Sequence, residues 1–354
     1  TPFPFEPRPD IETLRRAFKL HVPMRHRCAA GFALTLVSQP LGLFSLHVLG
    51  FQLFLERLIF EVGFFFCSAP EKPLNPTAEM GSLDMMHIVY ATEKRCFPVL
   101  LMSMVSVSRL HDPRHYTVHL ILYEHDMPAA ARLLECFNRS GATAHGLPRV
   151  VLHPYQLDPQ MLRLSQYPRA GYHHVVDKPI TWARLRLDSY LPALPRALYL
   201  DTDVMVKADL RPLYRMRMAH PLAAARESRE QRLSAPRRIR ADMRASHEEV
   251  PEPNVSFDTY FGTGVLLLDL DRWRAEGRRG ALERWAAAVP RGRALEANWH
   301  DQDLLNLAFQ ADVELLDWRW NVAGVSLEID VPRRCVEEAR ILHFSPRYDR
   351  HWLP

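Results

Sequence analysis

The chain has 354 residues, of which 47% are apolar and 24% are charged, and its net charge at pH 7 is +4. These proportions are typical of a globular protein that can bury one large core or two smaller ones. A net charge this small for the length argues against a nucleic-acid-binding protein, which normally carries a clustered basic face. The five cysteines form no Cys-x-x-Cys pair, so we expect free core thiols rather than a zinc site or a disulfide framework.

The N-terminal region has the composition of a membrane anchor. Residues 1–27 are rich in proline and basic residues, and residues 28–55 contain no Asp, Glu, Lys or Arg. A membrane-spanning helix needs about 20 mostly apolar residues, and basic residues before it favour a cytoplasmic N-terminus. We therefore predict a signal anchor within residues 28–67, a linker at 68–82 and a lumenal domain from residue 83 onwards.

A second interpretation of the apolar segment remains open. Gln39, Pro40 and His47 make it less apolar than a typical membrane span, so it could form a buried helical hairpin in a cytoplasmic protein. The Asn-x-Ser patterns at Asn138 and Asn254 match the acceptor of N-glycosylation, a weak signal that fits the lumenal alternative.

Beyond residue 83, short apolar runs alternate with segments of helical periodicity. Strands separated by helices favour right-handed crossovers and a mostly parallel sheet, so we predict an α/β fold, with a sheet flanked by helices, for residues 83–354. Residues 226–256 are highly charged and poor in large apolar residues, and we expect an inserted loop outside the core. We expect strands at 85–91, 118–123, 150–152, 197–200, 222–225, 260–270, 313–316 and 341–344, and helices at 97–110, 128–138, 180–191, 271–288 and 300–306.

Two carboxylates, Asp201 and Asp203, follow a short apolar strand and precede a second apolar run. Ligands of parallel sheets bind outside the carboxyl ends of the strands, where both side chains would lie. Two acidic groups held close together repel each other unless a cation lies between them. Magnesium and manganese take such oxygen ligands together with phosphate oxygens. The pattern therefore predicts a metal–diphosphate site, and its alternative is a strand end followed by a solvated turn.

Arg184 lies on the segment that leads into this strand. From there its guanidinium could neutralise a phosphate beside the two carboxylates. A surface ion pair with Asp188 is equally compatible with the sequence, because the two residues have i, i+4 spacing.

Three later motifs carry further polar or small residues. Gly262 and Gly264 come before an apolar strand, where they would let the backbone approach a ligand or form a bulge. Asp301 and Gln302 open a helix, where they could bind sugar hydroxyls or simply make a favourable first turn. His343 lies within an apolar strand, and from its position alone it is more typical of a core histidine than of a ligand.

Taken in this order, the motifs resemble the family 8 glycosyltransferases over roughly residues 86–352. The resemblance implies a single glycosyltransferase-A fold, a UDP-sugar donor, a Mn²⁺ (or Mg²⁺) ion, a saccharide or glycoconjugate acceptor and transfer of a hexosyl or pentosyl group with retention of configuration. It rests on Arg184-Leu185, the run from Leu191 to Asp203, the run from Tyr260 to Arg274, Asp301-Gln302-Asp303-Leu304-Leu305-Asn306, Trp320-Asn321, His343-Phe344 and Trp352.

The resemblance also assigns roles to individual residues. It makes Asp201, Asp203 and His343 the three metal ligands, and it places Asp301 and Gln302 beside the transferred sugar as the catalytic pair. For the mechanism it suggests front-face attack near Gln302, whereas a carboxylate nucleophile would have to be Asp301 or Asp303. The residues implied to contact the nucleotide-sugar are Ala91, Thr92, Arg184, Thr202, Gly262, Thr263, Gly264 and Trp352.

The sequence departs from the family pattern at two places. Gly262 stands where the family usually has Asn, and residues 345–352 lack the usual Gly and Lys unless Arg347 or Arg350 replaces the Lys. Two other classes of function therefore remain open. One is a nucleotide-sugar-binding protein of the same fold with lost or weak transfer activity, and the other is a membrane or scaffold protein with an incidental Asp-x-Asp.

Overall fold

The computed structural model describes residues 85–140, 147–156, 179–227, 235–237, 239–241, 258–288, 301–309, 312–325 and 331–344. The predicted N-terminal segment, anchor and linker lie outside these residues, and so does Trp352. Within the described part of the chain, every helix is too short or too polar to cross a bilayer.

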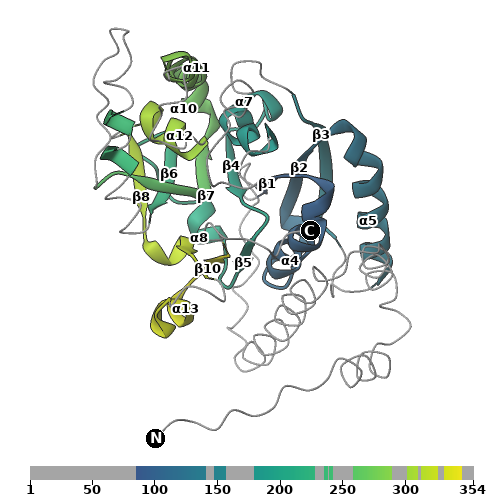
Figure 1. Cartoon of the computed structure of the whole chain (residues 1–354). Helices are drawn as coiled ribbons and strands as arrows, with labels where there is room; N and C mark the ends of the chain where they lie inside the picture. Colours follow the sequence, from purple (N-terminus) through teal and green to yellow (C-terminus); the bar gives the residue numbers. More distant parts are fainter. Residues whose placement is uncertain are drawn as a thin grey trace, which may run out of the picture.

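The described strands form one large sheet and one small sheet (Figure 1). The large sheet has the strand order β3-β2-β1-β4-β7-β6-β8. Neighbours from β3 to β4 are parallel, β7 is antiparallel to both β4 and β6, and β6 is parallel to β8. The mostly parallel sheet predicted from the sequence is confirmed. Its strands are β1 (Met86–Thr92), β2 (Tyr116–Leu122), β3 (Arg149–Pro154), β4 (Arg196–Leu200), β6 (Leu222–Arg226), β7 (Phe261–Asp269) and β8 (Val313–Leu316).

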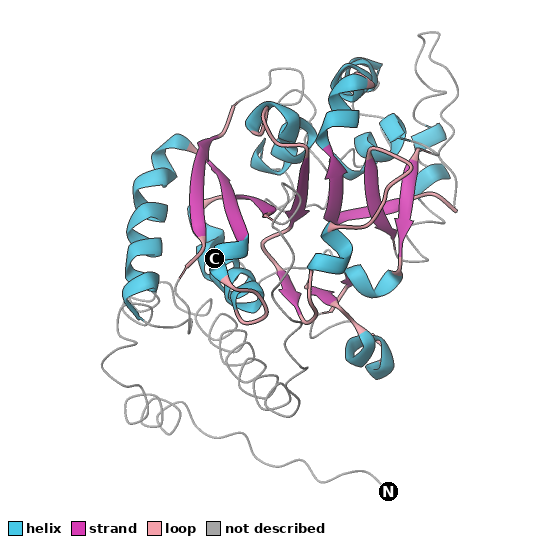
Figure 2. Ribbon diagram, turned by 180° about the vertical axis from the view of Figure 1, so that it is seen from behind, coloured by secondary structure: helices cyan, strands magenta, loops and turns pink. Residues whose placement is uncertain are grey.

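Helices cover both faces of the large sheet (Figure 2). One core contains Trp182, Trp273 and Leu304, from η6, α10 and α12, and the other contains Phe97 and Leu213, from α4 and α8. Every residue of β2 is buried, as expected for a parallel strand covered on both sides. The helices, with η marking 3-10 helices, are η3 (Lys94–Cys96), α4 (Phe97–Ser108), η4 (Pro113–His115), η5 (Glu124–Asp126), α5 (Met127–Ser140), η6 (Pro179–Arg186), α7 (Leu187–Tyr190), α8 (Arg211–Tyr214), α10 (Leu270–Ala275), α11 (Arg278–Ala288), α12 (Asp301–Phe309), η7 (Trp318–Asn321) and α13 (Arg333–Glu338).

The small sheet joins the end of the described chain to the Asp-x-Asp segment. It has the order β5-β10-β9, with β5 (Val204–Val206), β9 (Val322–Ala323) and β10 (Ile341–His343). Strand β10 is antiparallel to β5, so His343 pairs with Val204, the residue after Asp203. This pairing brings His343 to the carboxyl end of β4.

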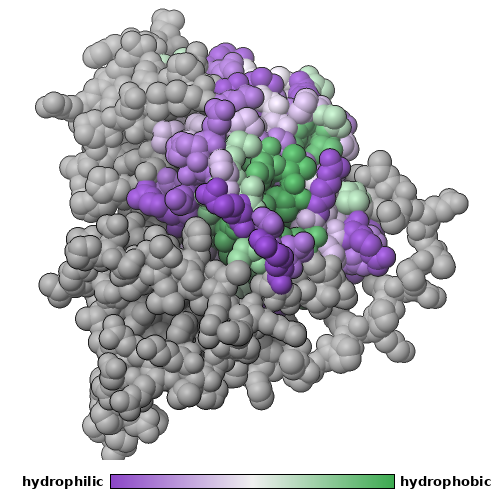
Figure 3. All heavy atoms as spheres, turned by 90° about the vertical axis from the view of Figure 1, so that its right-hand side faces the viewer, coloured by the Kyte–Doolittle hydropathy of each residue, from purple (hydrophilic) through white to green (hydrophobic). Residues whose placement is uncertain are grey.

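Strand β3 forms an edge of the large sheet, on the side of the molecule shown in Figure 3. Its residues are at most half-buried, and apolar groups lie among hydrophilic ones on this face.

A row of three histidines crosses the neighbouring strands β1, β2 and β3. His119 Nε2 lies 3.1 Å from His87 Nδ1, and His119 Nδ1 lies 3.0 Å from His153 Nε2. Burial lowers the pKa of all three imidazoles, so the row is neutral at pH 7.

Two predicted helices differ from those observed. The segment expected to be one α-helix at 180–191 is the 3-10 helix η6 followed by the short α7, a common arrangement at helix ends. The helix expected at 271–288 is divided into α10 and α11 by Gly277, whose φ of 63° is the left-handed conformation that terminates helices.

Two predictions about the core were wrong. Ala235 and Ile239, within the charged segment 226–256, are fully buried and belong to the same core cluster as Trp182 and Trp273. The cysteines expected in the core are only partly buried at the three described positions, Cys96, Cys136 and Cys335, and none of these three forms a disulfide.

Candidate functional site

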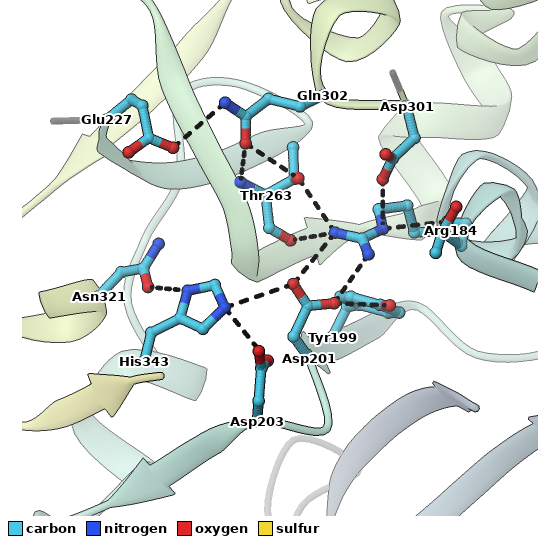
Figure 4. Close-up of polar contacts among 11 residues, drawn as sticks. Arg184, Tyr199, Asp201, Asp203, Glu227, Thr263, Asp301, Gln302, Asn321 and His343 are labelled. Carbon is cyan, nitrogen blue, oxygen red and sulfur yellow. Dashed lines mark hydrogen bonds and ion pairs between the residues drawn. The ribbon is translucent and has the colours of Figure 1, made fainter. Parts of the chain in front are cut away.

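Three side chains that could hold a metal ion converge at the carboxyl end of β4 (Figure 4). Asp201 and Asp203 lie in the turn between β4 and β5, and His343 comes from β10. One ligand atom from each residue lies within 4.8 Å of the others. His343 Nε2 is 3.2 Å from Asp203 Oδ1 and 3.7 Å from Asp201 Oδ2. Two carboxylates and an imidazole around one point are a donor set that suits manganese or magnesium.

Main-chain hydrogen bonds position both carboxylates. The amide of Asp201 donates to the carbonyl of Gly264 at 2.8 Å, which extends the β4–β7 pairing by one residue. The carbonyl of Asp203 accepts from the amide of Phe344 at 2.9 Å, which ties the turn to β10. Burial alone would raise the pKa of Asp203, but the adjacent His343 outweighs this effect and lowers it.

His343 is oriented by Asn321, at the end of η7. Its Nδ1 lies 3.0 Å from Asn321 Oδ1, an acceptor, so we assign the hydrogen to Nδ1 and direct Nε2 to the carboxylates. Burial would lower the pKa of His343, but Asp203, and then Asp201 and Glu227, outweigh burial and raise it. Asp201 and Asp203, which could hold a cation together with His343, therefore favour the protonated imidazole when no cation is bound.

Gly264 provides the space for the imidazole. A Cβ atom at this position would lie 2.5 Å from Nδ1 and 3.0 Å from Nε2 of His343, closer than real Cβ contacts. Because His343 is only 7% exposed, the ring has little room to retreat. The absence of a side chain at position 264 is therefore part of the geometry of the candidate metal site.

Arg184 lies between Asp201 and Asp301 and contacts both carboxylates. Its Nη2 is 2.8 Å from Asp201 Oδ1, and its Nη1 donates to the carbonyl and hydroxyl oxygens of Thr263 at 2.9 and 3.0 Å. The guanidinium stacks over the ring of Tyr199, at 4.8 Å from its centroid, and the Tyr199 hydroxyl donates to Asp201. Burial would lower the pKa of Arg184, but Asp201 and Asp301 outweigh it, so the pKa is raised and the charge is retained.

Asp301 begins α12 and faces the same guanidinium. Its Oδ2 is 2.7 Å from Arg184 Nε, but the Nε hydrogen is directed to the carbonyl of Thr181, so this contact is an ion pair without a hydrogen bond. Burial raises the pKa of Asp301, and Arg184 only partly offsets this effect. The alternative interpretation, a surface ion pair of Arg184 with Asp188, is wrong, because Asp188 contacts Arg279 instead.

Gln302 connects β7 to the end of β6. Its Oε1 accepts from the amide and hydroxyl of Thr263 at 3.2 and 3.3 Å, and its Nε2 donates to Glu227 Oε2 at 3.1 Å. Gly262 lies beside this pair. A Cβ atom at position 262 would lie 2.9 Å from Glu227 Oε2 and 3.2 Å from Asn321 Nδ2. Position 262 thus lies between the Glu227–Gln302 pair and the Asn321–His343 pair.

The remaining predicted residues lie along the same edge of the sheet. Ala91 and Thr92 end β1, and Thr92 is buried with its hydroxyl donating to the carbonyl of Glu93. Val89 pairs with Tyr199, which places Ala91 level with Asp201. Thr202 is half-buried in the turn between the two carboxylates.

Sequence reasoning missed three residues of the site: Tyr199, Glu227 and Asn321. Tyr199 precedes Asp201 by two residues, and the alternation of a strand places both on one face, so its position could have identified it. Glu227 follows the apolar run of β6 in the way that Asp201 follows β4, and it was obscured by the charges after it. Asn321 belongs to a motif that we used for the resemblance, but its contact with His343 follows only from the pairing of β9 with β10.

Comparisons with known proteins agree with this geometry. The model of the family described as "Glycosyl transferase family 8" matches residues 155–349. The chain is 28% identical over 206 residues to Probable galacturonosyltransferase-like 3 of Arabidopsis thaliana, covering 58% of this chain and 56% of the relative. It is also 28% identical to Glycosyltransferase 8 domain-containing protein 1 of Xenopus tropicalis, covering 59% of this chain and 60% of the relative. The chain thus spans about half the length of the curated relatives matched first, 54 to 56% for three of them.

Solved structures show the same fold at low sequence identity. An active-site mutant of LgtC superposes with a TM-score of 0.52 at 21% identity, covering 74% of this chain and 88% of that chain. The galactosyltransferase LgtC in complex with donor and acceptor sugar analogs gives a TM-score of 0.50 with the same coverage. The expected glycosyltransferase-A fold is therefore confirmed. Since the family model covers more than half of the sequence and includes every residue from Arg184 to His343, the chain belongs to glycosyl transferase family 8.

Proposed function

We propose that this protein is a metal-dependent retaining glycosyltransferase that moves a hexosyl-type sugar from a UDP-sugar to a saccharide or glycoconjugate acceptor. The observation that carries the proposal is the convergence of Asp201, Asp203 and His343 at the carboxyl end of β4, beside the buried Arg184. Membership of glycosyl transferase family 8 supports the reaction class.

Each side of the site has a separate task in this proposal. Asp201, Asp203 and Nε2 of His343 would hold a Mn²⁺ or Mg²⁺ ion, and Asn321 fixes the tautomer of the imidazole. A divalent cation, when bound, neutralises the charge that develops on the leaving diphosphate. Arg184 keeps Asp201 and Asp301 in place, because its guanidinium contacts both. Ala91 and Thr92 would contact the uracil and ribose, and Thr202 and the start of β7, residues 262–264, would contact the diphosphate.

The contacts of the acids favour front-face attack over a carboxylate nucleophile. Asp303 is 2% exposed and accepts a 2.7 Å hydrogen bond from Tyr260, so it is held in the interior. Asp301 is engaged by Arg184. Gln302 has no charge to form a covalent bond, but its amide can orient the sugar while the acceptor hydroxyl attacks the face that the diphosphate leaves.

Donor hydrolysis tests the proposal. The full chain is incubated with UDP-glucose, UDP-galactose, UDP-xylose and the two UDP-hexuronates, with Mn²⁺ or with a chelator, and the release of UDP is measured. The uronates belong in the panel because the plant relatives are named for galacturonosyl transfer. We expect release of UDP from at least one donor with Mn²⁺ only. Release that is unaffected by the chelator would contradict the proposed metal role.

A nucleotide-sugar-binding protein without turnover is the second candidate. The observation that favours it is Gly262, which removes an amide that most family members have at this position. Binding of UDP and Mn²⁺ without release of UDP from any donor, with a set of saccharide acceptors present, would support this candidate.

The predicted cellular location remains part of the proposal. The apolar segment 28–55 after a basic N-terminus supports anchoring in a Golgi or other secretory membrane with the catalytic domain in the lumen. Fractionation of cells that express the full chain tests this prediction, and recovery in the cytosolic fraction would favour the cytoplasmic alternative.

A further inference from the structure

Asp201 has a fixed main chain but a side chain that needs partners to fix it. Its amide donates to the carbonyl of Gly264 at 2.8 Å, which sets the backbone at the end of β4. The last torsion of an aspartate, which turns the plane of the carboxylate, has only broad preferences of its own. The direction of the two carboxylate oxygens therefore depends on the groups that donate hydrogen bonds to them.

Two hydrogen-bond donors engage Oδ1 of Asp201 (Figure 4). Nη2 of Arg184 donates to Oδ1 at 2.8 Å, and the hydroxyl of Tyr199 donates to it at 3.1 Å. A carboxylate oxygen has two lone pairs, so these two donors occupy both of them. In the described part of the chain, Oδ2 has longer contacts, with Nη1 of Arg184 at 3.4 Å and Nε2 of His343 at 3.7 Å. Oδ2 is thus the oxygen that faces His343 and keeps a lone pair for a further partner.

Tyr199 is held in place for this contact. The alternation of a strand puts Tyr199 and Asp201 on one face of β4. The tyrosine is fully buried, and the guanidinium of Arg184 lies over its ring, at 4.8 Å from the centroid. A buried tyrosine usually finds a partner for its hydroxyl, and the partner here is the Asp201 carboxylate. The packed ring therefore fixes the position of the hydroxyl, and the hydroxyl in turn restrains the carboxylate.

We propose that Tyr199 is a positioning residue of the metal site, whose hydroxyl acts with Arg184 to hold Oδ1 of Asp201 so that Oδ2 alone is presented to the cation. This inference rests on the proposed function, because it concerns the metal ion of the same site. Magnesium requires nearly ideal octahedral geometry and keeps positions for water and phosphate oxygens. An aspartate that binds through one oxygen leaves more of these positions open than one that binds through both. Partners that do not touch the metal but orient its ligands can therefore control its affinity.

Titration of the variant Y199F with Mn²⁺ tests this role. Phenylalanine keeps the ring beneath Arg184 and removes only the hydroxyl, so the Asp201 carboxylate should turn more freely. Isothermal titration of the full chain in the presence of UDP measures the affinity. We expect the affinity for Mn²⁺ to fall at least about tenfold, the lower end of the loss that follows when an outer partner of a metal ligand is removed.

The matched control is Y214F on α8. Tyr214 is also buried, and its hydroxyl donates to the carbonyl of Arg196 at the same distance, 3.1 Å. Both variants should lose a similar amount of stability in urea unfolding, but Y214F should bind Mn²⁺ as tightly as the unmodified chain. Equal Mn²⁺ affinity in Y199F and Y214F would show that Tyr199 only packs, and the proposed function would stand. If the unmodified chain itself does not bind Mn²⁺ with UDP present, the proposed function fails and the inference fails with it.

Discussion

Replacing Gly264 by alanine should remove His343 from the metal site. The new Cβ atom would lie 2.5 Å from Nδ1 and 3.0 Å from Nε2 of the imidazole, whereas ordinary contacts begin at 3.4 Å. The Cε1 atom of the ring would lie closer still, so the ring must retreat by more than about 1 Å, and a metal site tolerates only about 0.2 Å in its ligand distances. We expect the affinity for Mn²⁺ to fall at least about tenfold to a hundredfold, as it does when a ligand loses its orientation.

The fold should survive this change. Overpacking costs about 1–3 kcal/mol, partly offset by about 0.5–1 kcal/mol from the lower chain entropy of alanine in the unfolded state. Titration calorimetry with UDP present measures the Mn²⁺ affinity, and urea unfolding measures the stability. The matched control is G280A on α11, where a Cβ atom would meet only Arg284 Nη1, at 3.4 Å, and which should leave Mn²⁺ binding unchanged. If G264A binds Mn²⁺ as tightly as G280A, His343 is not a ligand in this geometry.

Three further predictions concern the acids, the arginine and the histidine row. D203N keeps one oxygen but loses the charge, so Mn²⁺ affinity should fall at least about tenfold in calorimetry, and an unchanged affinity would refute the ligand assignment. R184K cannot reproduce the fork of contacts to Asp201, Thr263 and Asp301, and it should cost about 1–3 kcal/mol in urea unfolding, whereas an unaltered midpoint would show that the fork contributes nothing. Burial, with smaller contributions from the neighbouring histidines, lowers the pKa of His119 from 6.5 to about 3, so the folded state stays neutral while the unfolded state takes up a proton. Stability should therefore fall by about 1.4 kcal/mol per pH unit for this group below about pH 6.5, and the variant H119Q should show a shallower fall between pH 6.5 and pH 5.

Local pattern identified the strands of the large sheet and two of the three side chains of the candidate metal site. The apolar run before Asp201 and Asp203 identified β4, and the alternation of strands and helices identified the parallel half of the sheet. The antiparallel direction of β7 was not predicted, because an apolar strand has the same composition in either direction. That direction matters for the site, since it brings the start of β7, rather than its end, to the carboxyl end of β4.

The contacts of charged residues were predicted less well than the strands. Spacing along one helix offered Arg184 a partner in Asp188, but the segment begins as a 3-10 helix and the guanidinium is buried against residues of three other elements. His343 has the sequence context of a core residue, and it is in fact buried, yet it faces two carboxylates. A burial pattern cannot separate these cases, because a ligand in an interior site and a core histidine are covered to the same extent. The family resemblance favoured the ligand, and the pairing of β10 with β5 brings His343 beside the two carboxylates.

The sequence singled out Gly262 and Gly264 at the start of β7, but the role that we expected for them was incomplete. Among the described glycines, positive φ angles occur at Gly277 and Gly324, so Gly262 and Gly264 have backbone conformations that any residue adopts. What they provide is volume. His343 fills the space beside Gly264, and Glu227 and Asn321 fill the space beside Gly262. A sequence pattern indicates that a side chain is missing, but the neighbour that takes its place comes from a distant strand, and that neighbour defines the chemistry of the site.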